Sequence, residues 1–260
     1  MTDQIAVVTG ASAGIGREMA RQLGAKGYEL WLVARREDRL DGLAVEIENS
    51  GRSKPTIICL DLTQRADRRD LVGRMTEHRD RLALLVNNAG FGAYGPTIRI
   101  PVSRQFEMIE LNITALTELS YEAAQLMVGK RSGAIINVAS TASFQPIPFQ
   151  SVYGATKAYV LSFTCALAEE VRAQGVHVMA LCPGLTRTEF QEIAGITRED
   201  FRMRHAMTAT RCSELGLRDF ERRKRVSITG AMNKAQIFAS WLFPRGLVIR
   251  VVARMMQDRA

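Results

Sequence analysis

Seven short, almost continuously apolar runs recur along the chain and alternate with segments of helical character. The runs lie at residues 4–9, 30–33, 56–60, 83–86, 134–138, 176–181 and 226–229. A strand that is buried on both faces has this pattern, and such strands belong to parallel sheets. The segments between them, such as 16–26 and 37–49, are rich in Ala, Leu, Glu and Arg, which indicates helical crossovers. We predict a single α/β domain over residues 1–260, a doubly wound parallel sheet of about seven strands with helices on both faces.

Composition is ordinary for a globular domain, because 47% of the residues are hydrophobic and 24% are charged. The formal net charge of +8 would suit an acidic partner such as nucleic acid, anionic lipid or a phosphorylated ligand. The cationic residues are spread along the chain, however. The one dense run, at 222–225, comes without zinc-finger spacing or an RNA-binding motif. We therefore expect no nucleic-acid partner.

The cysteines and histidines indicate the cellular compartment and whether a metal is bound. The four cysteines form no C-x-x-C pair and are expected to be reduced, which fits a cytoplasmic protein. The three histidines lack metal-ligand spacing, so we expect no metal. The chain begins without a signal-type segment, and no run reaches the roughly 18 apolar residues of a spanning helix. Peripheral attachment to a membrane surface remains the alternative to a purely cytoplasmic location.

The segment T-G-A-S-A-G-I-G at residues 9–16 joins the first predicted strand to the first predicted helix. Small residues there let the backbone turn tightly and approach a ligand closely. The helix N-terminus then offers N–H groups to a pyrophosphate. Glycines also serve ordinary turns, but their position between a buried strand and an amphipathic helix favours nucleotide binding. The spacing G-x-x-x-G-x-G differs from the commoner G-x-G-x-x-G.

The end of the second predicted strand bears on which dinucleotide is bound. An NAD site usually has Asp or Glu about 20 residues past the glycines, to hold the ribose 2′-hydroxyl. Here the strand ends in V-A-R-R at 33–36, without an acidic group. Because a guanidinium binds phosphate well, Arg35 favours NADP(H). Arg36 is interpreted as a solvated residue at the helix start.

Polar residues also follow the third and fourth predicted strands, at the edge of the sheet where ligands bind. Asp61 either accepts a hydrogen bond from an adenine amino group or caps the helix that starts near residue 64. The N-N-A-G segment at 87–90 either contacts the cofactor ribose or serves turn chemistry alone.

Tyr153 and Lys157 are four residues apart and fall on one face of a predicted helix. A phenol has an unperturbed pKa of about 10, and a nearby ammonium lowers this pKa, which would fit Tyr153 for proton transfer. Ser140 ends the fifth predicted strand, where a turn or a cap is the plain alternative. Asn112 lies inside a long helix predicted at 102–128. Asn is a mediocre helix former, so this residue is either exposed and incidental or functional.

Together these motifs resemble the classical short-chain dehydrogenases/reductases. The matching motifs occur in that family's order and approximate spacing and cover about residues 4–190. They are T-G-x-x-x-G-x-G at 9–16, N-N-A-G at 87–90, Asn112, Ser140, Tyr153-x-x-x-Lys157 and Pro183-Gly184. The resemblance implies a Rossmann-like fold and hydride transfer between NADP(H) and a carbonyl or secondary alcohol. The alternative is a non-catalytic NADP(H)-sensing protein of this fold. Such proteins typically lose the Tyr or the Lys, and both are present here.

The resemblance also implies a role for each residue. Tyr153 would be the general acid/base, and Ser140 would polarise the carbonyl oxygen. Lys157 would bind the nicotinamide ribose and lower the pKa of Tyr153, and Asn112 would hold a water that links Lys157 to solvent. The expected cofactor-binding residues are Gly10, Ser12, Gly14, Ile15 and Gly16 (pyrophosphate and ribose), Arg35 (2′-phosphate), Asp61 and Leu62 (adenine), Asn88, Gly90, Tyr153 and Lys157 (ribose), and Pro183, Gly184 and Thr188 (carboxamide).

Two departures from the family's pattern matter. Many NADP-preferring members have a basic residue just before the second glycine of the loop, where this chain has Ala13. That leaves the preference to Arg35, with help from Arg17. The family's usual V-D-G-G ending, which supports tetramers, is absent. The resemblance then implies a homodimer formed through the helices that carry Asn112 and Tyr153.

Two segments are expected to contact the substrate. The loop F-Q-P-I-P-F at 144–149 is apolar and stiffened by two prolines, and the segment 185–214 is too long for an ordinary turn. We interpret residues 185–214 as a mobile lid over an apolar pocket, with satellite core packing as the alternative. An apolar lid favours a hydrophobic ketone or aldehyde as substrate.

A C-terminal extension is expected over residues 231–260. It contains two predicted helices, 235–243 and 246–256, separated by Pro244. The second helix interleaves apolar residues with arginines. That composition suits a helix packed on the fold, which we prefer, or an interfacial helix on anionic lipid.

Overall fold

The computed structural model describes residues 3–195 and 206–257. Within them, seven strands form one fully parallel sheet in the order β3-β2-β1-β4-β5-β6-β9. The sheet is doubly wound, because the chain moves outward from β1 in one direction and then returns to build outward from β4. Its strands, which confirm all seven predicted runs, are β1 (Ile5–Thr9), β2 (Glu29–Ala34), β3 (Thr56–Cys59), β4 (Leu82–Asn87), β5 (Gly133–Val138), β6 (Val176–Cys182) and β9 (Val226–Ile228).

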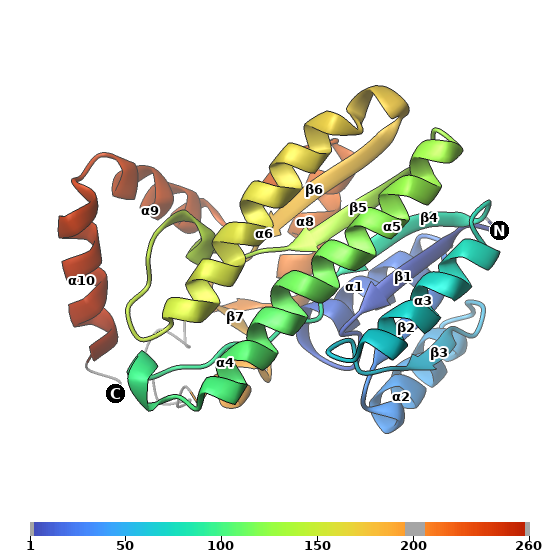
Figure 1. The fold of residues 1–260 in the computed structure, drawn as a ribbon. Helices are drawn as coiled ribbons and strands as arrows, with labels where there is room; N and C mark the ends of the chain where they lie inside the picture. Colours follow the sequence, from blue (N-terminus) through green and yellow to red (C-terminus); the bar gives the residue numbers. More distant parts are fainter. Residues whose placement is uncertain (1–2, 196–205, 258–260) are drawn as a thin grey trace.

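Helices cover both faces of the sheet (Figure 1). Alternation along β1 shows how this is encoded: Ala6 and Val8 pack in one hydrophobic cluster, while Ile5 and Val7 belong to the other. The first cluster includes side chains from α1 (Gly14–Ala25), α2 (Glu37–Asn49) and α8 (Ala209–Glu221), and the second includes side chains from α3 (Arg65–Glu77), α5 (Leu116–Gly129) and α6 (Ser151–Glu170). The predicted α/β architecture is confirmed.

The long helix predicted at 102–128 consists of three pieces. The α-helical parts are α4 (Val102–Ile109) and α5, and they are joined by a π-helical segment, η2 (Glu110–Ala115), which contains Asn112. Single π-turns inside α-helices are rare and occur frequently at functional sites. The apolar periodicity of the sequence does not distinguish such a turn from a continuous helix.

The segment after β6 adds short elements. Strands β7 (Thr186–Arg187) and β8 (Met207–Thr208) pair in parallel, and α7 (Phe190–Ala194) follows β7. The expected lid, residues 185–214, includes these elements, residues 196–205 outside the described part, and the first turns of α8. Short 3₁₀ turns lie at η1 (Thr97–Arg99), η3 (Thr141–Phe144) and η4 (Arg172–Gln174).

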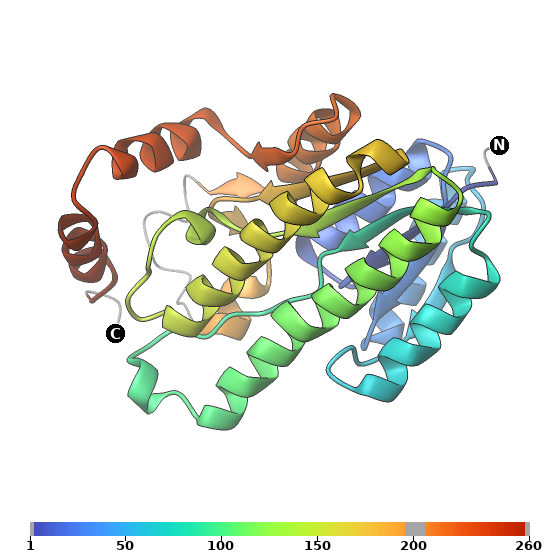
Figure 2. The same ribbon diagram turned by 45° about the horizontal axis from the view of Figure 1, so that its top comes forward.

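The C-terminal extension forms α9 (Ala231–Trp241) and α10 (Arg245–Gln257). Figures 1 and 2 both show this pair standing out from the end of the sheet, beyond the segment that joins β5 to α6. In α10 only Met256 is fully buried, and its apolar side chains at 247, 248, 251, 252 and 255 line a cavity. The apolar face of α10 therefore forms a cavity wall rather than packing closely on the sheet. Among the described residues, no helix is long and apolar enough to span a membrane.

Candidate active site

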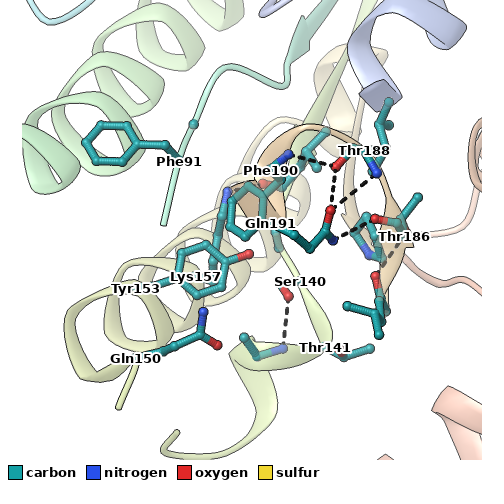
Figure 3. A pocket seen from close by; sticks show the side chains of 18 of the residues that line it. Phe91, Ser140, Thr141, Gln150, Tyr153, Lys157, Thr186, Thr188, Phe190 and Gln191 are labelled. Atoms are coloured by element: carbon teal, nitrogen blue, oxygen red, sulfur yellow. Dashed lines mark hydrogen bonds between the residues drawn. The ribbon is translucent and has the colours of Figure 1, made fainter. Parts of the chain in front are cut away.

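The carboxyl ends of β1, β2, β4, β5 and β6 open onto one large cavity of about 1530 Å³. It runs from the glycine loop after β1 to α10, and it contains Ser140, Tyr153 and Lys157 (Figure 3). In doubly wound sheets, ligands bind at this edge, where the strand order reverses. Here the reversal falls between β1 and β4. The topology thus places the predicted catalytic and cofactor residues around one space.

Ser140 follows β5 directly and is the N-cap of the η3 turn. Its backbone is extended, with φ −168° and ψ 163°, and its Oγ accepts a hydrogen bond from the Ala142 N–H at 3.1 Å. A capping role and a catalytic role for Ser140 are therefore compatible, because capping uses only one lone pair of the hydroxyl oxygen. The hydroxyl hydrogen stays available to a substrate oxygen in the cavity.

Tyr153 and Lys157 lie in the first two turns of α6 and both face the cavity. The Lys157 side chain is buried, and its Nζ donates to the backbone oxygen of Val138 at 2.8 Å. The Tyr153 ring packs against the ring of Phe190, with centroids 5.3 Å apart. A lid residue thus contacts the phenol directly.

Burial perturbs the pKa of both groups. It raises the pKa of Tyr153 to about 12, while a hydrogen bond with Ser140 acts in the opposite direction. It lowers the pKa of Lys157 to about 8. The shift on Tyr153 is opposite to the sequence-based expectation, because desolvation of the phenolate outweighs any help from the ammonium. At neutral pH the phenol is protonated, which is the form that a proton donor needs.

Asn112 is fully buried in the π-helical segment, so the exposed alternative is excluded. Its Oδ1 accepts from the Phe91 N–H at 3.1 Å, and its Nδ2 donates to the oxygens of Phe91 (3.0 Å) and Thr156 (3.1 Å). A Cβ on Gly90 would lie 2.8 Å from Asn112 Oδ1 and 3.5 Å from Lys157 Nζ. Asn112 therefore ties the segment after β4 to α6 beside the lysine. Its role as a water ligand stays a prediction.

The backbone of the glycine loop lies close to neighbouring segments, as its small residues predict. Gly14 has φ +56°, and a Cβ there would lie 2.9 Å from Thr188 Cγ2. A Cβ on Gly16 would collide with the Asn88 amide, whose Nδ2 donates to the backbone oxygens of Thr9 and Gly10 at 3.0 and 3.2 Å. Asn88 thus fixes the loop to β1, and its contact with a ribose stays a prediction. Gly10, Ser12 and Ile15 also line the cavity.

Two guanidinium groups border the cavity at the end of β2. Arg35 lies 3.7 Å from an oxygen of Asp61. Arg36, interpreted from the sequence as merely solvated, reaches the glycine loop: its Nη2 and Nε donate to Ser12 Oγ at 3.1 and 3.3 Å. Arg36 also pairs with Glu189 at 2.7 Å. Arg36 is exposed at the start of α2, as the sequence indicates, and its contacts with Ser12 and Glu189 give it a further place beside the glycine loop.

Asp61 serves the turn before α3, since its Oδ1 accepts from the Thr63 N–H at 3.0 Å and from the Thr63 hydroxyl at 2.8 Å. Asp61 and Leu62 both line the cavity near Arg35. This turn role does not exclude a contact with adenine, because the carboxylate has further lone pairs.

The segment from Pro183 to Thr188 borders the cavity opposite the glycine loop. A residue that the sequence analysis missed, Gln191, braces it. The buried Gln191 accepts at Oε1 from the Thr188 N–H (3.3 Å) and hydroxyl (3.4 Å), and its Nε2 donates to the Thr186 oxygen at 2.8 Å (Figure 3). Gly184 fits closely against Asn233 of α9, where a Cβ would collide with the amide. A Gln three residues after a Thr is not a recognisable sequence motif. Only the structure therefore shows that Gln191 supports the segment through these hydrogen bonds.

Cys59, Cys165, Cys182 and Cys212 are unpaired, and residues 3–195 and 206–257 contain no group of His, Cys, Asp or Glu that could hold a metal ion.

The fold and site define a nucleotide-binding α/β oxidoreductase with a Ser-Tyr-Lys centre. A family model described as short chain dehydrogenase matches residues 4–199, and the chain belongs to this family. It is 34% identical to sulfoacetaldehyde reductase 2 of Chromohalobacter salexigens over 188 residues, which cover 72% of this chain and 74% of that protein.

Solved structures resemble the whole fold. A short-chain dehydrogenase from Sphingobium yanoikuyae in complex with NADPH is 35% identical, with a TM-score of 0.84 over 94% of this chain and 95% of that one. A bulky-bulky ketone specific alcohol dehydrogenase from Comamonas testosteroni is 29% identical, with a TM-score of 0.80 over 95% and 94% of the two chains. The resemblance thus extends over nearly the whole chain.

Proposed function

We propose that this protein is an NADP(H)-dependent reductase of bulky, largely apolar ketones. The observation that carries the proposal is the convergence of Ser140, Tyr153 and Lys157 on one cavity, whose far end is walled by apolar side chains of α10. A carbonyl at Ser140 and Tyr153 would have its hydrophobic substituents in that apolar part.

The chain's own residues supply the proton and the orientation. The Ser140 hydroxyl donates to the carbonyl oxygen and stabilises the charge that develops there. Tyr153 gives its proton to that oxygen, and its high pKa keeps the phenol protonated at neutral pH. A protonated phenol is the form that carbonyl reduction requires. Lys157, fixed by Val138, is positioned to bind ribose hydroxyls.

The glycine loop, the segment 183–188 and the two arginines fit a phosphorylated dinucleotide. Gly10 and Gly14 line the cavity, and a Cβ on Gly14 would lie 2.9 Å from Thr188, so the backbone itself borders the space. Arg35 and Arg36 provide two guanidinium groups where a 2′-phosphate would bind. The hydroxyl of Ser12, in the glycine loop, accepts a hydrogen bond from Arg36. When bound, NADPH supplies the hydride. The related Sphingobium protein was solved with NADPH, which supports this cofactor.

The substrate class rests on the cavity wall and on one relative. The apolar wall of α10 and the loop 144–149 favour a ketone with two large apolar substituents. The Comamonas relative is described as specific for bulky ketones. We also propose that the protein is a homodimer and that it is cytoplasmic, with attachment to a membrane surface as the alternative location.

The rival function is non-catalytic sensing of NADP(H). Replacing Tyr153 by Phe removes only the hydroxyl. We expect this variant to lose turnover of an aromatic ketone by about 10²- to 10⁴-fold, the usual contribution of a positioned acid, with NADPH affinity retained. Tyr159→Phe on the same helix is the matched control, because its hydroxyl faces Thr117 outside the cavity. Steady-state NADPH oxidation and a fluorescence titration measure both effects. Parent-like turnover by Tyr153→Phe would refute the catalytic assignment.

A further inference from the structure

One buried amide in the cavity has no use in the chemistry described so far. Gln150 immediately precedes α6, is only 8% exposed and lines the cavity with Tyr153 (Figure 3). It occupies the N-cap position but makes no capping bond. Among residues 3–195 and 206–257, none forms a hydrogen bond with its side-chain amide. An amide offers two donors and one acceptor, and here these groups face the cavity, where a bound molecule that excludes water would have to pair them.

The backbone just before Gln150 adopts an unfavourable conformation. The preceding residue, Phe149, has φ +65°, in the left-handed region that a bulky side chain rarely adopts. The Phe149 oxygen accepts from the Gly95 N–H at 2.9 Å, the Gln150 N–H donates to Ile147 at 3.1 Å, and the Gly154 N–H donates to Gln150 at 2.8 Å. An unfavourable conformation that three hydrogen bonds maintain, next to a catalytic tyrosine, indicates a functional position.

The surroundings limit what the amide can bind. Ser140 and Tyr153 serve the reacting carbonyl, and the apolar side chains of Ile147 and Phe190 also line the cavity. Gln150 is three residues before Tyr153, and side chains at that spacing on a helix lie about 5–6 Å apart. A substrate oxygen that reaches the amide therefore belongs to the same molecule as the reacting carbonyl and lies only a few bonds from it.

We propose that Gln150 forms a second substrate subsite, which binds an oxygen near the reacting carbonyl and selects 1,3-dicarbonyl compounds such as 3-oxo esters over plain ketones. This proposal rests on the reductase function proposed above. The amide donates to the second carbonyl through Nε2, so the reacting carbonyl is held at two points. A plain ketone of equal length leaves the buried amide unpaired and binds less well.

The test compares two bulky substrates of matched length, a 3-aryl-3-oxo ester and an aryl alkyl ketone, in the parent and in Gln150→Leu. We expect the parent to prefer the oxo ester and the Leu variant to lose about three- to tenfold in kcat/KM on the oxo ester alone, as for one hydrogen bond. NADPH affinity, which also reports folding, stays unchanged. Gln64→Leu is the matched control, because Gln64 is also a helix N-cap residue without a side-chain capping bond but does not line the cavity.

A second variant, Gln150→Glu, keeps the volume but removes the donor, and it is expected to lose the same preference. The ratio of kcat/KM between the two substrates is the deciding quantity, since a purely structural defect lowers both equally. An equal loss on both substrates, or no change on either, would overturn the subsite while leaving the reductase function intact. A parent that binds NADPH but reduces neither compound would overturn both proposals.

Discussion

Arg36 shows how much one side chain can change the interpretation of a cofactor site. In the sequence it is one of two arginines at the end of a strand, and only Arg35 was assigned to a phosphate. In the structure, Arg36 is the one that bonds the Ser12 hydroxyl, while Arg35 is the more exposed, with 62% of its side chain accessible. Arg36 is also tied to Glu189, so it is better positioned before any ligand binds.

We predict that Arg36→Ala and Arg35→Ala each weaken NADPH binding by about tenfold or more, with little effect on NADH. Hydrogen bonds to charged groups contribute about 1.5–3 kcal/mol, and only NADPH has the 2′-phosphate. Arg39→Ala is the control, because Arg39 begins the same helix and pairs with Asp38 and Glu189 without lining the cavity. Fluorescence titration with both dinucleotides measures the affinities. Equal NADPH and NADH affinities in the parent would contradict the NADP(H) assignment.

Residue types at the site could be predicted from the sequence, but their environments could not. Ser140, Tyr153 and Lys157 were found from their order and spacing, and the structure brings them to one cavity. The pKa of Tyr153 was expected below its usual value and lies above it, because burial depends on tertiary contacts such as Phe190. Gln150 and Gln191 were missed for the same reason, since neither belongs to a local motif.

At the scale of elements, the segment between β6 and α8 combines a short strand pair with a single-turn helix, and Gln191 connects them. Its amide joins the Thr186 oxygen of β7 to Thr188, the residue expected to contact the cofactor. Elements this short have little stability of their own, so such side-chain bonds determine their geometry. Gln191 is therefore a positioning residue for Thr188.

Replacing Gln191 by Leu should weaken NADPH binding by about tenfold, because about two hydrogen bonds that orient Thr188 are lost. A double-mutant cycle separates this effect from a general defect. If Gln191 acts through Thr188, then Thr188→Ala/Gln191→Leu binds NADPH as weakly as Thr188→Ala alone. Thermal unfolding of each variant is the control for stability. Additive losses would show that Gln191 acts independently of Thr188.

Long periodic elements were predictable, and short or irregular ones were not. The seven sheet strands could be recognised because a strand buried on both faces needs a continuous apolar run. The π-helical segment around Asn112 and the β7–β8 pair leave no comparable pattern. Their geometry depends on contacts across the fold, such as the bonds between Asn112 and Phe91.

At the scale of the whole molecule, the parallel sheet gathers loops from distant parts of the chain at one edge, and the C-terminal helices stand out beyond this edge (Figure 2). Side chains of these helices line the cavity. The helices α4, α5 and α6 carry three exposed aromatic side chains, Phe106, Tyr121 and Tyr159, which we call the aromatic patch. Tyr159 stacks on Phe163 and bonds Thr117 of α5, so α5 and α6 present one continuous surface. The sequence predicted a homodimer through these helices, and this patch supports that prediction.

We predict that the protein is a dimer in solution and that Tyr121→Arg makes it a monomer. A stable dimer buries about 1,600 Å² in total, and a charge placed at an interface core of aromatic side chains is costly to desolvate. Phe238→Arg is the matched control: Phe238 is similarly exposed, at 62% against 56% for Tyr121, but it lies on α9, away from the patch. Sedimentation velocity distinguishes the two states. A dimer that survives Tyr121→Arg but dissociates with Phe238→Arg would place the interface on the C-terminal helices instead, and a monomeric parent would exclude the dimer altogether.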